Sequence, residues 1–307
     1  MCDLRPVFFE RLDWYQALRP EDGASWNVVR GPNKSWYTRS LNAALAFALD
    51  HRLYDTYRAR FAGLSIKALR PAADGHSSAF AIWGVANELL GARYLERRFQ
   101  WTLDLHEPPG RSRHVGDWQF VTPSGRTVFV EVKSVPDARL PPRQAASVNF
   151  TPTVRSHLAR ACRQLPADGR ATLVLLVGGC VILDISERFP VINPLLEALF
   201  GAYQVRFNVM PYDPDTLEAG PSLYDMLVQP RKHTRLGCVA ALLPGGRDYP
   251  TLRFYAIHNP FASDAALAST DLEAAFQFVV DKDGHGSFSG HLQPDVWERL
   301  RPLQHGG

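Results

Sequence analysis

The chain has 307 residues, of which 46% are hydrophobic and 21% are charged, and its net charge is +3. These proportions are ordinary for a folded globular protein and exclude a chain that is disordered throughout. The weak net charge identifies no class of partner, but the charge is unevenly distributed. Residues 111–170 carry ten basic and four acidic side chains. Such a local excess attracts polyanions, although an ordinary solvated basic face has the same composition.

Targeting and redox signals are lacking in the sequence. None of the four cysteines forms a C-x-x-C pair, which argues against a zinc knuckle and a disulfide framework. The opening residues MCDLRPVFFERLDW lack the basic region and apolar core of a signal peptide. The longest apolar run, LVLLVGGCVIL (173–183), is too short to span a bilayer, and its two glycines favour a hairpin. We therefore expect a cytoplasmic protein with no membrane partner.

The first half of the chain predicts helices followed by strands. Residues 1–75 form a mainly helical region, with helix-like apolar spacing over 41–64, and a turn-rich break follows at 70–78. A strong helix is predicted over 80–99. Three strands are predicted next, over 99–105, 114–122 and 126–135. The tight turn TPSG joins the last two.

The second half predicts one more helix and several strands. Residues 151–165 form a helix with Thr151 as its N-cap. The expected apolar face of this helix consists of Val154, Leu158, Ala161 and Leu165. The remaining predicted elements are strands at 171–177, 180–185, 203–210, 235–243 and 251–258, a long loop at 211–233, and helices near 190–202 and 271–280. We predict three parts: a helical region (1–75), a core (76–260), and a C-terminal helix and tail (261–307).

The strand TVFVEVKSV (127–135) places two charged residues in a run of valines. Because alternate side chains of a strand point to opposite faces, Glu131 and Lys133 share one face with Phe129, and the valines share the other. Asp117 interrupts the preceding strand, and across a hairpin it would lie at the same end as Glu131. Converging carboxylates in a low-dielectric site are tolerated when a divalent cation neutralises them or one of them takes up a proton.

These residues suggest a metal site with a nearby cation. Asp117, Glu131 and the carbonyl of Val132 would make a partial shell for Mg²⁺ or Mn²⁺. Lys133 would orient or deprotonate a water molecule, or stabilise charge on a phosphate. On the helix over 80–99, the neighbours of Glu88 one turn away are small or apolar, so we expect Glu88 to face the sheet as a third inward carboxylate.

Glu88 on a leading helix, Asp117 on a strand and Glu131-Val132-Lys133 on the next strand, followed by a helix and a strand, form a pattern that resembles the PD-(D/E)XK nuclease superfamily over roughly residues 80–185. The resemblance implies an α/β fold with a restriction-endonuclease-like core, a mixed central β-sheet flanked by helices. Here an N-terminal helical region and a C-terminal α/β extension would be added to that core.

The resemblance also implies an activity, which is metal-dependent hydrolysis of phosphodiester bonds in DNA. Asp117 and Glu131 would bind Mg²⁺ or Mn²⁺, Glu88 would be the auxiliary acid, and Lys133 would activate water or stabilise the phosphate. The residue before Asp117 is Gly116, where the family pattern has proline. A homodimer would supply the two sites that cutting both strands of a duplex needs.

Six further residues are expected to contact nucleic acid. Gln119 shares the face of Asp117, Ser134 follows the lysine, and His157, Arg160 and Gln164 form a stripe on the following helix, where this family often places site residues. The expected nucleic-acid-binding residues are Gln119, Ser134, Arg155, Arg160, Arg163 and Gln164.

Two alternatives stay open. A catalytically inactive protein of the same fold would bind nucleic acid or a protein partner without cleaving it. An unrelated α/β protein would use Glu131 and Lys133 as a structural ion pair. Metal-dependent cleavage separates the nuclease from the inactive protein, and the topology of the sheet separates both from the unrelated fold.

Overall fold

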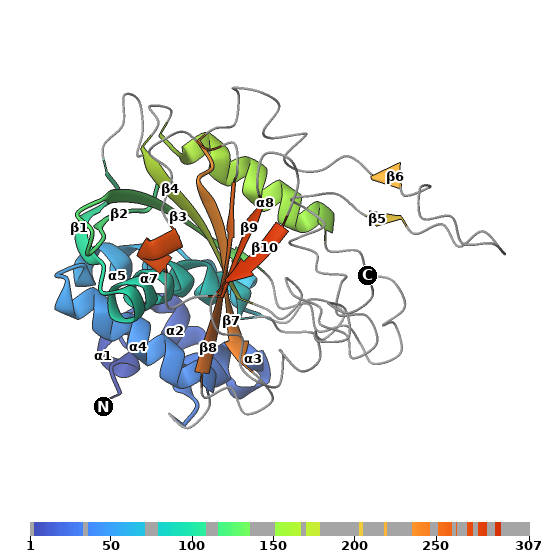
Figure 1. Ribbon diagram of the computed structural model, residues 1–307. Helices are drawn as coiled ribbons and strands as arrows, with labels where there is room; N and C mark the ends of the chain where they lie inside the picture. Colours follow the sequence, from blue (N-terminus) through green and yellow to red (C-terminus); the bar gives the residue numbers. More distant parts are fainter. Residues whose placement is uncertain are drawn as a thin grey trace, which may run out of the picture.

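Figure 1 shows a mixed α/β protein in which helices flank a central sheet. The computed structural model describes residues 3–32, 36–70, 79–108, 116–135, 151–166, 170–178, 203–204, 218–219, 235–245, 251–259, 262, 269–272, 276–280 and 286–289. The predicted helix near 190–202, the strand at 180–185, and most of the strand at 203–210 and of the loop at 211–233 lie outside these residues. Within the predicted loop, Glu218–Ala219 form the short strand β6.

The N-terminal part consists of short helices that pack against the long helix α7. The helical elements are α1 (Arg5–Phe9), α2 (Asp13–Ala17), η1 (Pro20–Asp22), α3 (Ala24–Arg30), α4 (Trp36–Asp50), α5 (Tyr54–Ala62), α6 (Ile66–Leu69), α7 (Phe80–Phe99), α8 (Thr151–Gln164) and η4 (Ser269–Leu272). Among the helices of the described residues, none is long and apolar enough to cross a membrane.

Within the described residues, eight strands form one mixed sheet in the order β1-β2-β3-β4-β7-β8-β9-β10, and β5 pairs separately with β6. The strands are β1 (Thr102–His106), β2 (Trp118–Val121), β3 (Thr127–Val135), β4 (Ala171–Gly178), β5 (Tyr203–Gln204), β6 (Glu218–Ala219), β7 (Cys238–Gly245), β8 (Thr251–His258), β9 (Phe276–Val280) and β10 (Gly286–Ser289).

The part of the sheet nearest the predicted site is an antiparallel meander. β1 pairs with β2 and β2 with β3, across the predicted TPSG turn, and the chain then passes through α8 to place β4 parallel to β3. The element order is therefore helix, three strands, helix, strand. Strand β2 is shorter than β3, and its first residue, Trp118, lies opposite Val130. The end of β3 beyond Val130 thus lacks a β2 partner.

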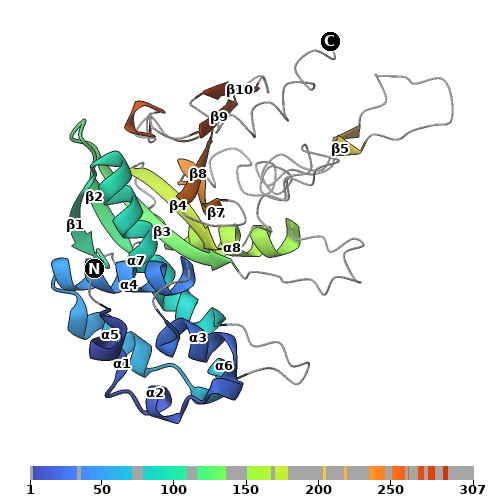
Figure 2. The ribbon, with the colours of Figure 1, turned by 90° about the horizontal axis from the view of Figure 1, so that it is seen from below.

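The two faces of β3 and β4 are covered by different helices (Figures 1 and 2). Val128, Val130 and Val132 belong to the core beneath α7 and the N-terminal helices. Lys133 lies on the other face and contacts Gln164 of α8. The predicted alternation of β3 and the predicted apolar face of α8 are both confirmed, since Val154, Leu158, Ala161 and Leu165 are all buried.

Helix α7 approaches the sheet closely because Gly91 has no side chain. A Cβ atom at Gly91 would lie 2.8 Å from Cδ2 of Leu175. One apolar core runs from Phe8 in α1 to Leu272 in η4, so the N-terminal helices and the sheet share it. The position of α7 therefore depends on both parts of the chain.

Two helix predictions are wrong. The predicted helix over 41–64 is two helices, α4 and α5, separated at Arg52, whose φ of 60° lies in the left-handed region and cannot continue a right-handed helix. The predicted helix near 271–280 is a 3₁₀ turn followed by β9. A short apolar run fits a helix or a strand equally well, and here β9 pairs with β8 and β10.

We expect opposite outcomes for alanine at two glycines of α7. No atom lies within 4 Å of a Cβ placed at Gly84, so Gly84→Ala should raise the free energy of unfolding by about 0.5–1 kcal/mol through the better helix propensity of alanine. Gly91→Ala should give no such gain, because its new methyl would overlap Leu175. Chemical denaturation of both variants checks this, and equal gains at the two positions would contradict the packing described for α7.

Candidate active site

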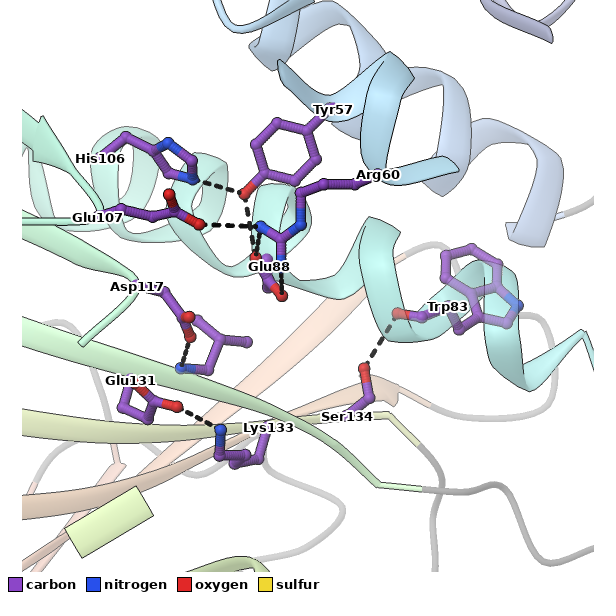
Figure 3. Close-up of polar contacts among 11 residues, drawn as sticks. Tyr57, Arg60, Trp83, Glu88, His106, Glu107, Asp117, Glu131, Lys133 and Ser134 are labelled. Carbon is purple, nitrogen blue, oxygen red and sulfur yellow. Dashed lines mark hydrogen bonds and ion pairs between the residues drawn. The ribbon is translucent and has the colours of Figure 1, made fainter. Parts of the chain in front are cut away.

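Asp117 lies immediately before β2, where the pairing of β2 with β3 ends. Its N–H donates to the carbonyl of Val130 (2.9 Å), and its Oδ2 accepts from the N–H of Val132 (2.7 Å), as Figure 3 shows for the second bond. The N–H and C=O of one strand residue point to the same side. The carbonyl of Val132 therefore faces the side on which Asp117 lies, and the strand end brings a carboxylate and a backbone oxygen together.

Gly116 fixes the approach to Asp117. Its φ is 78°, and a Cβ here would lie 3.0 Å from the carbonyl oxygen of Val130. Its N–H donates to the carbonyl of Gln164 at 2.9 Å. Proline fixes φ near −65° and has no N–H, so proline fits neither the conformation nor the hydrogen bond. This explains why glycine, and not proline, precedes Asp117 in this chain.

Glu131 is fully buried and only partly satisfied. Its side chain has 0% exposure, and its Oε1 accepts a close ion-paired hydrogen bond from Nζ of Lys133. Its Oε2 has no hydrogen-bond partner among the residues that the structure describes. Nζ of Lys133 also donates to Oε1 of Gln164 at 2.9 Å, and the Lys133 side chain keeps 20% exposure. The Glu131–Lys133 ion pair is therefore partly exposed on the lysine side, and one carboxylate oxygen of Glu131 is not hydrogen-bonded within the described residues.

Two residues of α5, Tyr57 and Arg60, bind the carboxylate of Glu88 on α7. Arg60 donates from its two terminal nitrogens to Oε2 and Oε1 of Glu88 at 2.5 and 2.6 Å, and the Tyr57 hydroxyl donates to Oε2 at 3.1 Å (Figure 3). The same hydroxyl lies 3.2 Å from Nε2 of His106. Glu107 follows, with Oε1 4.0 Å from Arg60. Glu88 thus faces the site as predicted, but its carboxylate is already paired with a cation.

Burial and mutual repulsion disfavour the ionised carboxylates. Burial, together with the charge of Asp117, raises the pKa of Glu131 to about 8 against the attraction of Lys133. The same two causes raise the pKa of Glu88 to about 7 against the attraction of Arg60. Burial also raises the pKa of Asp117, although the Val132 N–H opposes the shift. The three acids therefore occupy one electrostatically coupled, water-poor region.

The donor set fits a hard divalent cation. A buried carboxylate oxygen without a partner is costly unless a proton or a cation takes it, and Oε2 of Glu131 is such an atom beside Asp117. Mg²⁺ binds carboxylate and carbonyl oxygens and keeps several waters, so Asp117, Glu131 and the carbonyl of Val132 suit it. Within the described ranges, no group of three or more His, Cys, Asp and Glu side chains is arranged to hold a metal ion. An ion here would rely on two carboxylates, a backbone oxygen and water.

The structure brings the predicted catalytic side chains together and separates some of the predicted nucleic-acid contacts from them. Glu88, Asp117, Glu131 and Lys133 converge, and Gln164 joins them through Lys133. Ser134 does not, because its hydroxyl is bound by Trp83 and Asn87 of α7.

Polar groups of the protein already engage two of the predicted contacts. The Ser134 hydroxyl donates to the carbonyl of Trp83 (3.0 Å) and accepts from the amide of Asn87 (2.9 Å). Gln119 donates to Oδ2 of Asp104 at 2.5 Å, across the pairing of β1 and β2. Both side chains thus have partners within the fold.

The predicted basic residues of α8 lie along the helix that covers the Lys133 face. Arg160 and Arg163 are exposed, and Arg155 is half-buried. Arg160 contacts the carbonyl of Ser156 on its own helix. The pKa of His157 is lowered by burial and by the cations Arg160 and Lys133. His157 therefore lies close enough to Lys133 for its pKa to be affected, and Gln164 contacts Lys133 directly.

The sequence did not identify Tyr57, Arg60, His106 and Glu107. Tyr57 and Arg60 lie on one side of α5, three residues apart. The available signal was indirect: a glutamate predicted to face the core requires a partner for its charge. Nothing in the spacing locates that partner 28 residues upstream.

Comparison with protein-family models, with curated proteins and with solved structures found no match to this chain. The geometry of the site therefore carries the functional argument.

The metal-free protein should lose stability as the pH rises. The pKa of Glu131 is raised from 4.5 to about 8, so between these values the folded protein holds a proton that the unfolded chain has released. Stability from this source is present at low pH and is lost as the pH rises from about 4.5 to about 8. Glu131→Gln should flatten the dependence of melting temperature on pH. The exposed-site control Glu10→Gln should not, and matching curves for the Glu131→Gln variant and the unsubstituted protein would contradict the prediction.

Proposed function

We propose that the chain is a divalent-metal-dependent nuclease that hydrolyses phosphodiester bonds in DNA. The observation that carries the proposal is the fully buried Glu131, which has one open oxygen beside Asp117 and a lysine bound to its other oxygen. Two carboxylates that repel each other in a buried strand end are costly for folding, which is a common signature of a site where function outweighs stability.

The topology supports a restriction-endonuclease-like core. Helix α7, the β1-β2-β3 meander, helix α8 and the parallel strand β4 follow one another in the order that the resemblance to the PD-(D/E)XK superfamily implies. Asp117 precedes the second strand of the meander, and Glu131 and Lys133 lie on the third. Glu88 on α7 and Glu131 and Lys133 on β3 lie in the expected elements, whereas Asp117, expected within a strand, lies one residue before β2.

Each residue has a role that its contacts support. Asp117, Glu131 and the carbonyl of Val132 would hold Mg²⁺ or Mn²⁺, which when bound supplies a Lewis acid and a water of lowered pKa. Lys133 has three N–H donors, and two of them are used by Glu131 and Gln164. The third is available in this arrangement for a phosphate oxygen or a water molecule. Gln164 thus orients Lys133, and the exposed Arg160 and Arg163 would contact the DNA backbone.

A catalytically inactive protein that binds nucleic acid or a protein partner is the second candidate. The pairing of Glu88 with Arg60 favours it, because this pairing takes the auxiliary acid out of reach of a metal ion. An inactive protein would still need a reason to keep Asp117, Glu131 and Lys133 together. DNA as substrate, a homodimer that presents two sites, and a cytoplasmic location are further parts of the main proposal.

Substitutions at Glu131 and Lys133 should separate metal binding from chemistry. Glu131→Ala removes one of the two carboxylates that repel each other without metal and would bind the metal ion. The variant should therefore lose most of any melting-temperature increase that Mg²⁺ or Mn²⁺ induces. Lys133→Ala keeps both carboxylates, so it should retain that increase and yet lose cleavage of plasmid DNA by about 10²-fold or more. The exposed Lys67→Ala on α6 is the matched control and should change neither quantity.

Scanning fluorimetry with a metal titration and a plasmid cleavage assay measure the two effects. If Lys133→Ala cleaves like the unsubstituted protein while Glu131→Ala is unfolded, the pair is a structural ion pair and the proposal fails. Absence of cleavage with both metals, on plasmid, linear duplex and single-stranded DNA, would favour the inactive protein.

A further inference from the structure

We infer that the N-terminal helical region completes the active site by supplying Arg60 of α5 as a phosphate-binding residue. This inference rests on the proposed nuclease function and adds a residue and a chain segment to it. Arg60 reaches the site from outside the helix-strand-strand-strand-helix-strand unit, and the sequence pattern gave residues 1–75 no role in the chemistry.

The side chain of Arg60 is partly exposed although it pairs with a buried carboxylate. Its bidentate pair with Glu88 uses two of five N–H donors, and the side chain keeps 33% exposure while Glu88 keeps 12%. Glu107 flanks it at 4.0 Å. An arginine that only neutralised a core carboxylate would be sealed with it. Arg60 instead pairs with Glu88 and still has a partly exposed side chain.

The backbone geometry around Arg60 is strained. Glu107 is a non-glycine residue with a φ of 48°, and its N–H donates to the carbonyl of Asp117 at 2.8 Å. A left-handed conformation costs such a residue roughly 1 kcal/mol or more, and it persists only where its surroundings enforce it. Here it ties the end of β1 to Asp117 and turns the Glu107 carboxylate toward Arg60. Strain is common at functional sites, and this residue joins the two halves of the candidate site.

The support for Arg60 is rigid. The Tyr57 ring stacks on Trp118 with an interplanar angle of 3°, and Cζ of Arg60 lies 5.1 Å from the centre of the Tyr57 ring. Trp118 is the residue after Asp117. A preformed guanidinium loses little conformational entropy on binding, so this placement favours recognition of a phosphate over simple charge balance.

The charges complement a DNA strand. Burial raises the pKa of Asp117, and the charges of Lys133 and Arg60 oppose this shift. Lys133 contacts Gln164 of α8, and Arg60 pairs with Glu88 of α7 (Figure 3). A nucleic acid strand carries one phosphate per nucleotide, so a strand that crosses this edge would bring successive phosphates to the two cations.

The first experiment measures DNA affinity without cleavage. A short fluorescent DNA duplex is titrated, in Mg²⁺ and at several salt concentrations, against the Lys133→Ala variant with and without Arg60→Gln. Arg60→Gln should weaken binding roughly tenfold or more, and it should reduce the slope of log affinity against log salt by about 0.9. Arg58→Gln removes the same charge from α5 on a side that contacts Tyr54, so it should leave both quantities nearly unchanged.

A second set of variants covers the case in which Arg60→Gln is destabilised by the carboxylate that it leaves unpaired. Glu88→Gln keeps Arg60, and the double variant Glu88→Gln/Arg60→Gln removes both charges together. The double variant should bind DNA more weakly than Glu88→Gln by the same factor. Equal affinities and equal salt slopes for these two variants would overturn the inference.

The outcomes separate this inference from the proposed function. If the unsubstituted protein cleaves DNA and Arg60→Gln matches the Arg58→Gln control in affinity and salt slope, the inference is wrong and the nuclease proposal stands. If the protein neither cleaves DNA nor, as Lys133→Ala, binds the duplex, the proposed function fails and the inference fails with it.

Discussion

The site is organised by the burial of Glu131, a carboxylate with no exposed surface and with one oxygen that no group of the described residues satisfies. Burial alone would keep this acid protonated, and the neighbouring Asp117 disfavours its charge further. Lys133 offsets part of this cost by binding one oxygen. Asp117 lies close enough to repel the charge of this carboxylate, so a divalent cation is the partner that would satisfy both acids at once.

The fold provides this arrangement through a difference in strand length. Because β2 begins opposite Val130, the N–H of Val132 has no partner in β2 and donates instead to the side chain of Asp117. Helix α8 then fixes two points with one residue, since the carbonyl of Gln164 accepts from Gly116 and its side chain accepts from Lys133. The opposite face is closed by α7. Local backbone pairing, and not a special loop, therefore positions the acids.

Sequence reasoning succeeded where the information is local. The alternation of β3, the TPSG turn and the apolar face of α8 all depend on residues within one element or one hairpin, and Asp117 and Glu131 meet because that hairpin fixes their register. The pairing of Glu88 with Arg60 depends instead on how α5 packs against α7, which spacing does not encode. The prediction of a helix near 271–280 was wrong for a related reason. A short apolar run fits a helix or a strand, and here its pairing with β8 and β10 makes it the strand β9.

The central claim is that Asp117 and Glu131 together form a divalent cation site, and a crystal soaked in Mn²⁺ tests it most directly. The account predicts an anomalous difference peak in contact with both carboxylates, and it predicts that Asp117→Asn crystals lose this peak. A map without a peak at these residues, in which Glu131 still binds Lys133, would contradict the claim and identify the buried pair as a structural feature of the sheet.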